Sequence, residues 1–218
     1  MPNWCYNKMR IAKKNFEEFK QKYIVDGKFD FNKVIEMPKD LHDTISGGKI
    51  DECIGCYLFT TMSKAKAFEE YKKMHLHLYG IHKTYTKTEI LLDLWDRVGD
   101  HPKMYNSEYE NLKNNTTEYT PEQVGKYYYI LYQKYGVYDW YQWANKYWGV
   151  KWNACNTLID DEKHTIWFDT AWGRPMGIYE KIAKDNPAWK ININAHYECS
   201  NETTQCTIVN GMVVRKGE

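Results

Sequence analysis

A chain of 218 residues with 43% hydrophobic residues can bury one large core or two small ones, which excludes an extensively disordered protein. Its 30 basic and 29 acidic residues give a formal net charge of +1, which excludes the strongly basic balance typical of nucleic-acid-binding proteins. Aromatic residues make up 16% of the chain, so large rings are expected to supply much of the core.

Apolar stretches in the sequence are short. Lys8, Arg10 and Lys13 interrupt the N-terminal segment, which therefore lacks the apolar run of a secretory signal peptide. No segment reaches the roughly 20 apolar residues of a membrane helix. We therefore expect a cytoplasmic protein without a membrane partner, in which the six cysteines are thiols.

The N-terminal segment predicts a strand followed by a helix. Alternation from Asn3 to Ile11 places Tyr6 and Lys8 on the face opposite the apolar residues. Apolar positions at helical spacing predict an amphipathic helix from about Lys14 to Tyr23, and Val25–Gly27 follows as its exit turn.

The segment from about Gly27 to Gly149 has mainly helical patterns. Ser63 and Thr120 are favourable N-cap residues, and Pro121 suits a first helical turn. The predicted helices are Ser63–Tyr79, Thr86–Val98, Pro121–Tyr135 and Tyr138–Trp148.

The C-terminal third predicts strands around one helix. Gly173–Pro175 is expected to open the helix and Asn186-Pro187 to end it. A final hairpin or edge strand is expected at Cys206–Arg215, because it contains Asn210-Gly211. The other predicted strands are Cys155–Asp160, His164–Thr170 and Trp189–Glu198, the last with strict alternation.

Together these elements predict an α+β protein with a ferredoxin-like βαββαβ antiparallel sheet. A long, mainly helical insertion, about 27–149, separates the first helix from the second strand. We expect a single domain over 1–218, with its core formed by 1–26, 150–199 and a C-terminal strand at 205–215.

Five strings, four of which contain tryptophan, resemble in this order the YubB ferredoxin-like family of bacteriophage and plasmid proteins. They are MPNWCYN (1–7), FDFNKVIEMP (29–38), DWYQW (139–143), YWGVKWNA (147–154) and FDTAWGRP (168–175). The resemblance covers both ends of the chain and leaves out about 40–137. It implies a ferredoxin-like domain, an origin on a mobile element and therefore a bacterial host cell. It brings no established activity.

One face of the predicted sheet is a candidate binding site. Helices on one side would leave the other side with aromatic, amide and cationic side chains, which is the composition that single-stranded nucleic-acid readers use. A helical insertion that covers this face is the alternative. The face residues are Tyr6, Lys8, Trp167, Asp169, Lys190, Asn192, Asn194 and His196.

A second candidate is a group of tryptophans near residues 140–172. Its indole N–H groups need acceptors when buried, which Asn153 or Asp169 would supply. The group is interpreted first as a structural hub and alternatively as a small-ligand pocket. Its residues are Trp140, Trp143, Lys151, Trp152, Asn153 and Trp172.

Cys53 and Cys56 have a spacing that zinc sites use, but a structural site needs four ligands. A second pair would have to come from His75 and His77, or from Cys155, Cys199 or Cys206, and no cofactor is predicted. The seven histidines are scattered outside known catalytic motifs, which favours a protein that is not an enzyme.

The sequence therefore favours a non-enzymatic accessory protein of a phage or plasmid that binds and modulates a host protein or ribonucleoprotein complex. An inhibitor of bacterial defence, such as of a CRISPR effector, is the concrete form of this hypothesis. The helical insertion would then dock the partner. The alternatives are single-stranded nucleic-acid binding by the open sheet face and a zinc-dependent or small-molecule-binding protein.

Overall fold

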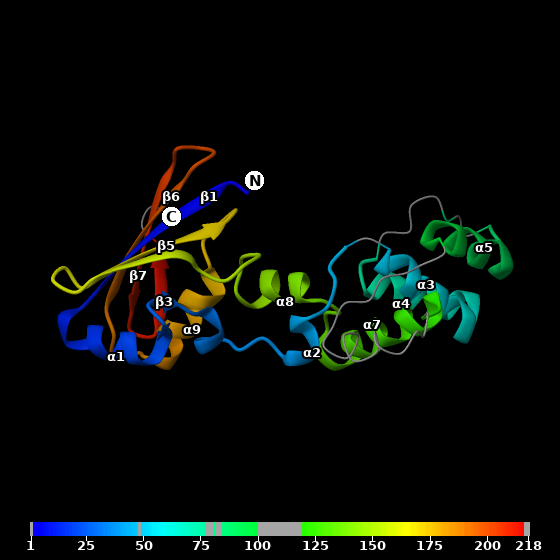
Figure 1. The fold of residues 1–218 in the computed structure, drawn as a ribbon, viewed down its shortest axis with the longest axis horizontal. Helices are drawn as coiled ribbons and strands as arrows, with labels where there is room; N and C mark the ends of the chain where they lie inside the picture. Colours follow the sequence, from blue (N-terminus) through cyan, green and yellow to red (C-terminus); the bar gives the residue numbers. More distant parts are fainter. Residues whose placement is uncertain (1, 48, 77–80, 82–83, 100–118, 216–218) are drawn as a thin grey trace. The chain divides into compact units, whose positions relative to one another are not determined.

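The computed structural model describes residues 2–47, 49–76, 81, 84–99 and 119–215. The chain forms two compact units (Figure 1). The sheet unit contains Met1–Met37 and Ala144–Glu218, and the helical unit contains Pro38–Trp143. The segments 27–37 and 144–149, expected within the insertion, thus belong to the sheet unit.

A six-stranded antiparallel sheet forms the sheet unit, in the order β4-β5-β1-β6-β7-β8. The N-terminal strand β1 lies between β5 and β6, so both ends of the chain build one sheet, as predicted. The strands are β1 Trp4–Ile11, β4 Cys155–Asp160, β5 Thr165–Ala171, β6 Ile191–Tyr197, β7 Thr203–Val209 and β8 Met212–Arg215. The expected final hairpin is β7–β8, with its turn at Asn210-Gly211, where both residues have positive φ.

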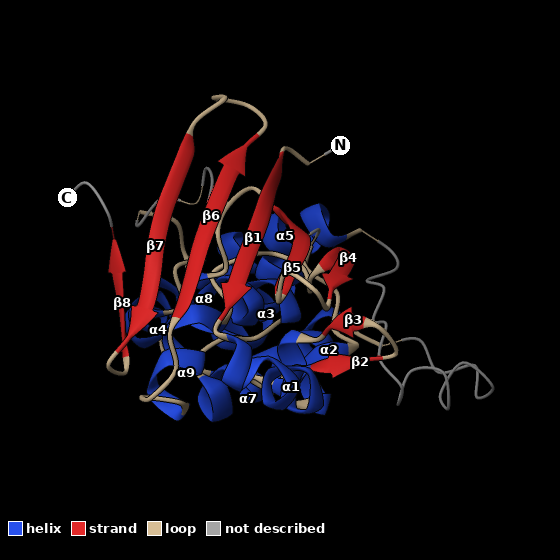
Figure 2. Cartoon of the chain, turned by 90° about the vertical axis from the view of Figure 1, so that its left-hand side faces the viewer, coloured by secondary structure: helices blue, strands red, loops and turns tan. Residues whose placement is uncertain are grey.

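Two helices, α1 (Lys13–Tyr23) and α9 (Met176–Asp185), lie on the same side of the sheet (Figure 2). Phe16 and Phe19 of α1 and Ile178 of α9 are buried there. A small hairpin of β2 (Ile24–Val25) and β3 (Lys28–Phe29) and a 3-10 turn η1 (Phe31–Lys33) follow α1. Phe29 and Phe31 each pack edge-on against Phe168 of β5, with ring centroids 5.1 and 6.0 Å apart. These rings extend the core beyond the two helices.

A polar network lies inside this core. The Asn7 side chain, 1% exposed, donates to the Thr170 hydroxyl at 2.8 Å and accepts from the Tyr179 hydroxyl at 2.8 Å. The Thr170 hydroxyl in turn donates to the carbonyl of Gly173 at 2.6 Å. Because buried polar groups are costly unless they are paired, this network favours one register between β1, β5 and α9.

The helical unit contains most of the predicted helices. N-caps at Ser63 and Thr120 form as predicted, and Thr120 completes a capping box with Gln123. The predicted helix Ser63–Tyr79 corresponds to α4 only as far as Lys73, and residues 77–79 lie outside the described residues. The helices are α2 Lys39–His42, α3 Ile50–Thr61, α4 Lys64–Lys73, α5 Lys87–Val98, α7 Pro121–Tyr135 and α8 Trp140–Tyr147, and the border of the units falls within α8.

Helix α3 was not predicted, because it lacks an amphipathic pattern. It packs against α4, α5 and α7, and burial on several sides removes the polar stripe that identifies a surface helix. Its buried residues are Ile50, Cys53, Ile54, Gly55, Cys56, Leu58 and Phe59. The helix at the centre of the helical unit therefore has no amphipathic pattern by which its sequence could be recognised as a helix.

Asp40 of α2 contacts two side chains of α7. Its carboxylate accepts from Lys134 Nζ at 2.6 Å and from the Tyr135 hydroxyl at 2.8 Å, and these hydrogen bonds lower the pKa of Asp40. A lowered folded-state pKa means that the stabilisation is complete above the ordinary carboxyl pKa and is lost as pH falls.

We expect Asp40→Asn to lower the free energy of unfolding by less than about 1 kcal/mol near pH 7, since the pair is partly exposed and screened. The difference in the free energy of unfolding between the variant and the wild type should shrink as the pH is lowered from 6 to 3. Urea denaturation of both proteins at these two pH values measures it. A difference that grows on acidification would contradict this role of Asp40.

Candidate functional site

Strict alternation in β1 gives the sheet a second face, on the side opposite α1 and α9. Cys5, Met9 and Ile11 point to the helices and are buried, whereas Tyr6 and Lys8 on the opposite side are exposed. Strand β6 repeats the pattern, with isoleucines facing the helices and asparagines facing outward. Because the strands are in register, their outward residues form one continuous surface. We call it the open face.

The pairing register arranges the open face in three rows that cross β5, β1, β6 and β7. The first row is Asp169, Tyr6, His196 and Thr203. The second is Trp167, Lys8, Asn194 and Gln205. The third is Thr165, Arg10, Asn192 and Thr207, of which Thr165 is buried. Every predicted open-face residue lies in a row except Lys190, which is exposed just before β6. The register thus brings together residues that are up to about 190 positions apart in the sequence.

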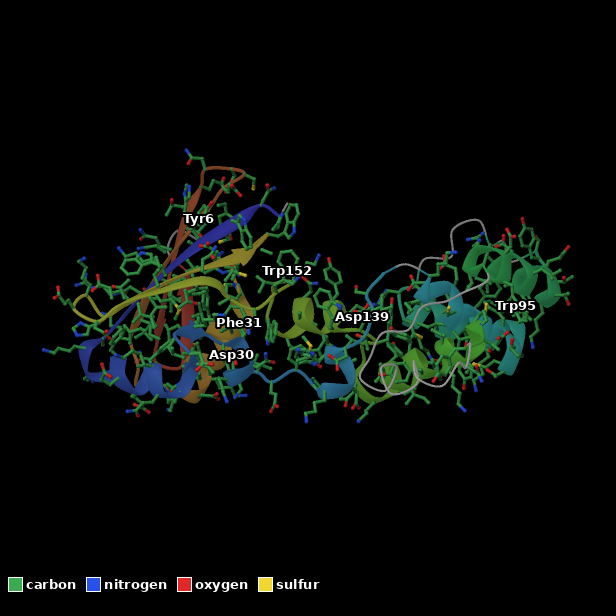
Figure 3. The ribbon with its side chains drawn as sticks, in the orientation of Figure 1. Tyr6, Asp30, Phe31, Trp95, Asp139 and Trp152 are labelled. Carbon is green, nitrogen blue, oxygen red and sulfur yellow. The ribbon has the colours of Figure 1, made fainter. Side chains whose placement is uncertain are left out.

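Contacts within the rows hold the rings in place. Tyr6, which Figure 3 labels, is 42% exposed. Its ring stacks on the ring of His196, with an angle of 17° between the ring planes and 6.1 Å between the ring centroids. Lys8 Nζ lies 5.4 Å from the centre of the Trp167 ring, a cation–π contact. Trp167 itself is half-buried. The face therefore presents ordered aromatic surface next to a cation.

Charges divide the open face into two zones. Near the first row, partial desolvation and the carboxylates of Glu198 and Asp169 raise the pKa of Tyr6. Lys8 and Arg10 are in the second and third rows, and Lys190 lies just beyond them. Within the described residues, none of these three cations has a carboxylate in ion-pair distance.

The carboxylates on this side have local partners. Asp169 accepts from the Asn156 amide at 2.8 Å, and Asp160 at the end of β4 pairs with Lys163 at 3.1 Å. Glu198 accepts from the Trp4 backbone N–H at 2.8 Å. The second and third rows therefore have a basic character that the net charge of the chain does not reveal.

The predicted tryptophan group is divided between the two units. Trp140 and Trp143 belong to the helical unit, where Trp143 is buried. Lys151, Trp152 and Trp172 belong to the sheet unit with Asn153. There Lys151 Nζ lies 4.6 Å from the centre of the Trp152 ring, and Trp172 is 61% exposed.

Asn153 connects the strand region to the segment after β3. Its side-chain oxygen accepts from the backbone N–H of Phe31 at 2.8 Å, and its amide donates to Asp30 at 2.7 Å. Figure 3 labels Asp30 and Phe31. The indole of Trp148 donates to the carbonyl of Ile35 at 2.9 Å. Two of the five strings, FDFNKVIEMP and YWGVKWNA, are thus joined by hydrogen bonds, which supports the structural interpretation of these residues.

The cysteines at 53 and 56 are buried on helix α3. Burial raises the pKa of Cys53 to about 12 and that of Cys56 still further. Of the other proposed zinc ligands, Cys155, Cys199 and Cys206 belong to the sheet unit, and His77 lies outside the described residues. Within the described part of the chain, no three His, Cys, Asp or Glu residues gather as a metal site would require.

A buried carboxyl group at Asp139 was not predicted as a special site. Asp139, which Figure 3 labels, is 2% exposed, and burial raises the pKa of its carboxyl group. Its Oδ1 accepts from the backbone N–H of Gln142 at 2.7 Å, at the start of α8. It therefore acts as a helix cap, a role that the Asp-Trp-Tyr-Gln sequence could have indicated.

Sequence reasoning missed five members of the rows as site residues: Arg10, Thr165, Thr203, Gln205 and Thr207. Arg10 was placed on the correct face by alternation, but its neighbours come from pairing that no local pattern contains. Thr203, Gln205 and Thr207 lie on β7, which starts before the expected strand and for which no face was predicted.

Together the fold and the face define an α+β protein with a six-stranded antiparallel sheet. Among the described helices, none has both the length and the apolar character that crossing a membrane requires. No protein-family model matches the chain, and no curated protein matches its sequence. The resemblance to the YubB ferredoxin-like family therefore stays a prediction from the motifs.

A solved structure is similar over the full length: the crystal structure of a protein api92 from Yersinia pseudotuberculosis, described with the family model DUF1281. The alignment covers 100% of this chain and 99% of that chain, with 9% sequence identity and a TM-score of 0.43. The likeness is therefore a distant one, and it leaves the function to be argued from the residues of this chain.

Proposed function

We propose that this chain is a non-enzymatic binding protein that holds a host macromolecule on the open face of its sheet. One observation carries the proposal: four adjacent strands present ring, amide and cationic side chains in aligned rows on the side opposite α1 and α9. A surface of this kind offers stacking and hydrogen bonds together over a wide area.

The order of elements supports a ferredoxin-like arrangement beneath this face. Along the chain, β1, α1, β4, β5, α9 and β6 follow the βαββαβ pattern, with the helical unit between α1 and β4. The first strand pairs antiparallel with β5 and with β6. With β7 and β8 added at one edge, the sheet offers a broader surface than four strands would.

The chemistry of the rows favours binding over catalysis. The open-face carboxylate Asp169 already accepts a hydrogen bond from Asn156, and His196 is stacked on Tyr6. These groups are therefore positioned by neutral or aromatic neighbours rather than arranged as an acid and a base around one reacting atom. The rings and amides that remain exposed are groups that recognise a ligand.

The proposal is tested with the double variant Tyr6→Thr, Trp167→Thr, because threonine keeps the strand propensity while removing both rings. Immobilised full-length proteins are exposed to bacterial extract, and the retained macromolecules are quantified. We expect the double variant to retain at least about tenfold less than the wild type, because the loss of even one stacking contact costs about 1–3 kcal/mol. Equal retention by both proteins would refute the proposal.

A second candidate is docking of a host protein on the helical unit, as the sequence hypothesis of a defence inhibitor implies. Leu92 and Trp95, one helical turn apart on α5, are 66% and 51% exposed. Trp95→Ala is therefore the matched control in the extract experiment. Retention that depends on Trp95 and not on the open face would favour this second candidate.

A further inference from the structure

We propose that the ligand of the open face is single-stranded nucleic acid, with bases stacked on Tyr6 and Trp167 and phosphates bound by Lys8, Arg10 and Lys190. This inference rests on the proposed function and names its ligand. It follows from four properties of the face: the spacing of the rings, the amides beside them, the position of the charges and the place of the apolar residues.

The two rings lie on adjacent strands near the middle of the sheet. Tyr6 is paired with Asp169, and Lys8 is paired with Trp167, so Tyr6 and Trp167 are diagonal neighbours on one face. Diagonal neighbours in an antiparallel pair are about 7–8 Å apart. Aromatic residues on a sheet surface are the stacking platforms of sheet-based readers of single strands, which bind two or three bases in this way.

Amide side chains continue the surface next to the rings. Asn194 follows Lys8 in the second row, and Gln205 follows Asn194. Each amide has both a donor and an acceptor, as the edges of unpaired bases do. In the third row, Asn192 accepts from the Thr207 hydroxyl at 3.3 Å, so this amide is already oriented. Base edges extending beyond the rings would meet these groups.

The positions of the cationic side chains favour phosphate groups bound along the second and third rows. Lys8 lies over Trp167, so the backbone of a strand stacked on that ring would pass an ammonium group. Arg10 and Lys190, without ion-pair partners among the described residues, extend the cationic zone. Asp169 and Glu198 at the other end would repel phosphates from the first row. The backbone is thus directed along one side of the face.

The exposed aliphatic residues of the sheet lie on its two edge strands. Leu158 is 67% exposed on the edge strand β4, and Met212 and Val214 are 62% and 46% exposed on the opposite edge strand β8. Protein–protein interfaces have the reverse arrangement, an apolar centre inside a polar rim. The polar and aromatic centre of this face therefore favours nucleic acid over a protein as its occupant.

The experiment measures fluorescence anisotropy of a labelled 12-nucleotide poly(U), a 12-nucleotide poly(dT) and a 12-base-pair duplex with the full-length protein. We expect both single strands to bind more tightly than the duplex, because duplex bases cannot stack on a flat face. With three phosphate contacts, log K should fall against log salt with a slope of about −2.

Variants connect the binding to the face. We expect Trp167→Ala to weaken single-strand binding about tenfold, as one lost stacking contact implies, and Trp95→Ala to leave it unchanged. Lys8→Gln, which removes an exposed charge and its cation–π contact with Trp167, should make the salt slope less steep by about 0.7. Circular dichroism shows whether Trp167→Ala folds. If it does not, Lys8→Gln still tests the inference.

Two results would overturn the inference: absence of single-strand binding at low salt, or binding that Trp167→Ala and Lys8→Gln leave unchanged. If retention from extract nevertheless depends on the open face and survives nuclease treatment, the proposed function stands and the occupant is a protein. If neither the binding of oligonucleotides nor the retention of extract components depends on the open face, both proposals fail.

Discussion

Gly177→Ala is expected to destabilise the sheet unit by about 3 kcal/mol, the upper part of the range for inserted core atoms. Gly177 is in the first turn of α9, where the chain passes directly over the end of α8. A Cβ at this position would lie 2.0 Å from the carbonyl oxygen of Tyr147, and an ordinary contact begins near 3.4 Å. Both partners are backbone, so no rotamer change relieves the overlap.

The sign of this effect is the opposite of what helix propensity predicts. Replacing glycine by alanine inside a helix usually stabilises it by about 1 kcal/mol. The overlap exceeds this gain, because α9 must move away from Tyr147 and Trp148 and the buried Ile178 moves with it. Urea denaturation followed by far-UV circular dichroism measures the loss.

Gly173→Ala is the matched control. Gly173 lies four residues earlier, has an ordinary φ, and has no atom within 4 Å of its Cβ position. It should change the free energy of unfolding by less than about 1 kcal/mol. Equal stability of Gly177→Ala and Gly173→Ala would show that α9 does not pack closely on the end of α8.

The strands of the sheet could be predicted because their faces differ. In β1 and β6, buried and exposed positions alternate, so both the existence of the strand and the direction of Tyr6 and Asn194 follow from the sequence. The same alternation, applied to β5, predicts that Trp167 points to the open face. Most of the open face was therefore predictable residue by residue.

The arrangement of those residues into rows was not predictable. A shift of one residue in pairing would send every side chain of a strand to the other face, and a shift of two would change all cross-strand neighbours. The observed register, with Lys8 between Trp167 and Asn194, depends on contacts across the whole chain. The hydrogen bonds of Asn7 in the core are one physical reason for that register.

Helix α3 could not be predicted from the sequence because it is buried on several sides, and so the helical environment of Cys53 and Cys56 could not be predicted either. A spacing of three residues is compatible with a metal loop, a redox turn or adjacent turns of a helix, and only packing distinguishes these. Desolvation raises the pKa of both thiols, which opposes the thiolate form that binds zinc. The structure therefore gives a physical reason to prefer ordinary buried cysteines here.

Gly125→Ala is expected to destabilise the helical unit by about 3 kcal/mol, for the same physical reason in a different setting. Gly125 is in the second turn of α7, at its contact with α3. An added Cβ would lie 1.9 Å from the carbonyl oxygen of Cys53 and 2.9 Å from the Cα of Ile54. The helix backbones approach too closely for any side chain, so α3 and α7 must separate along their shared interface.

Lys126→Ala is the control for this substitution, since Lys126 is the next residue of α7 and is exposed. It preserves the close contact and should change stability by less than about 0.5 kcal/mol. Hydrogen exchange of the α3 amides locates the effect: Gly125→Ala should increase exchange there, because separated helices expose the backbone of α3, while Lys126→Ala should not. Unchanged protection of α3 in Gly125→Ala would mean that the two helices can separate without loosening the centre of the unit, which a packed interior does not allow.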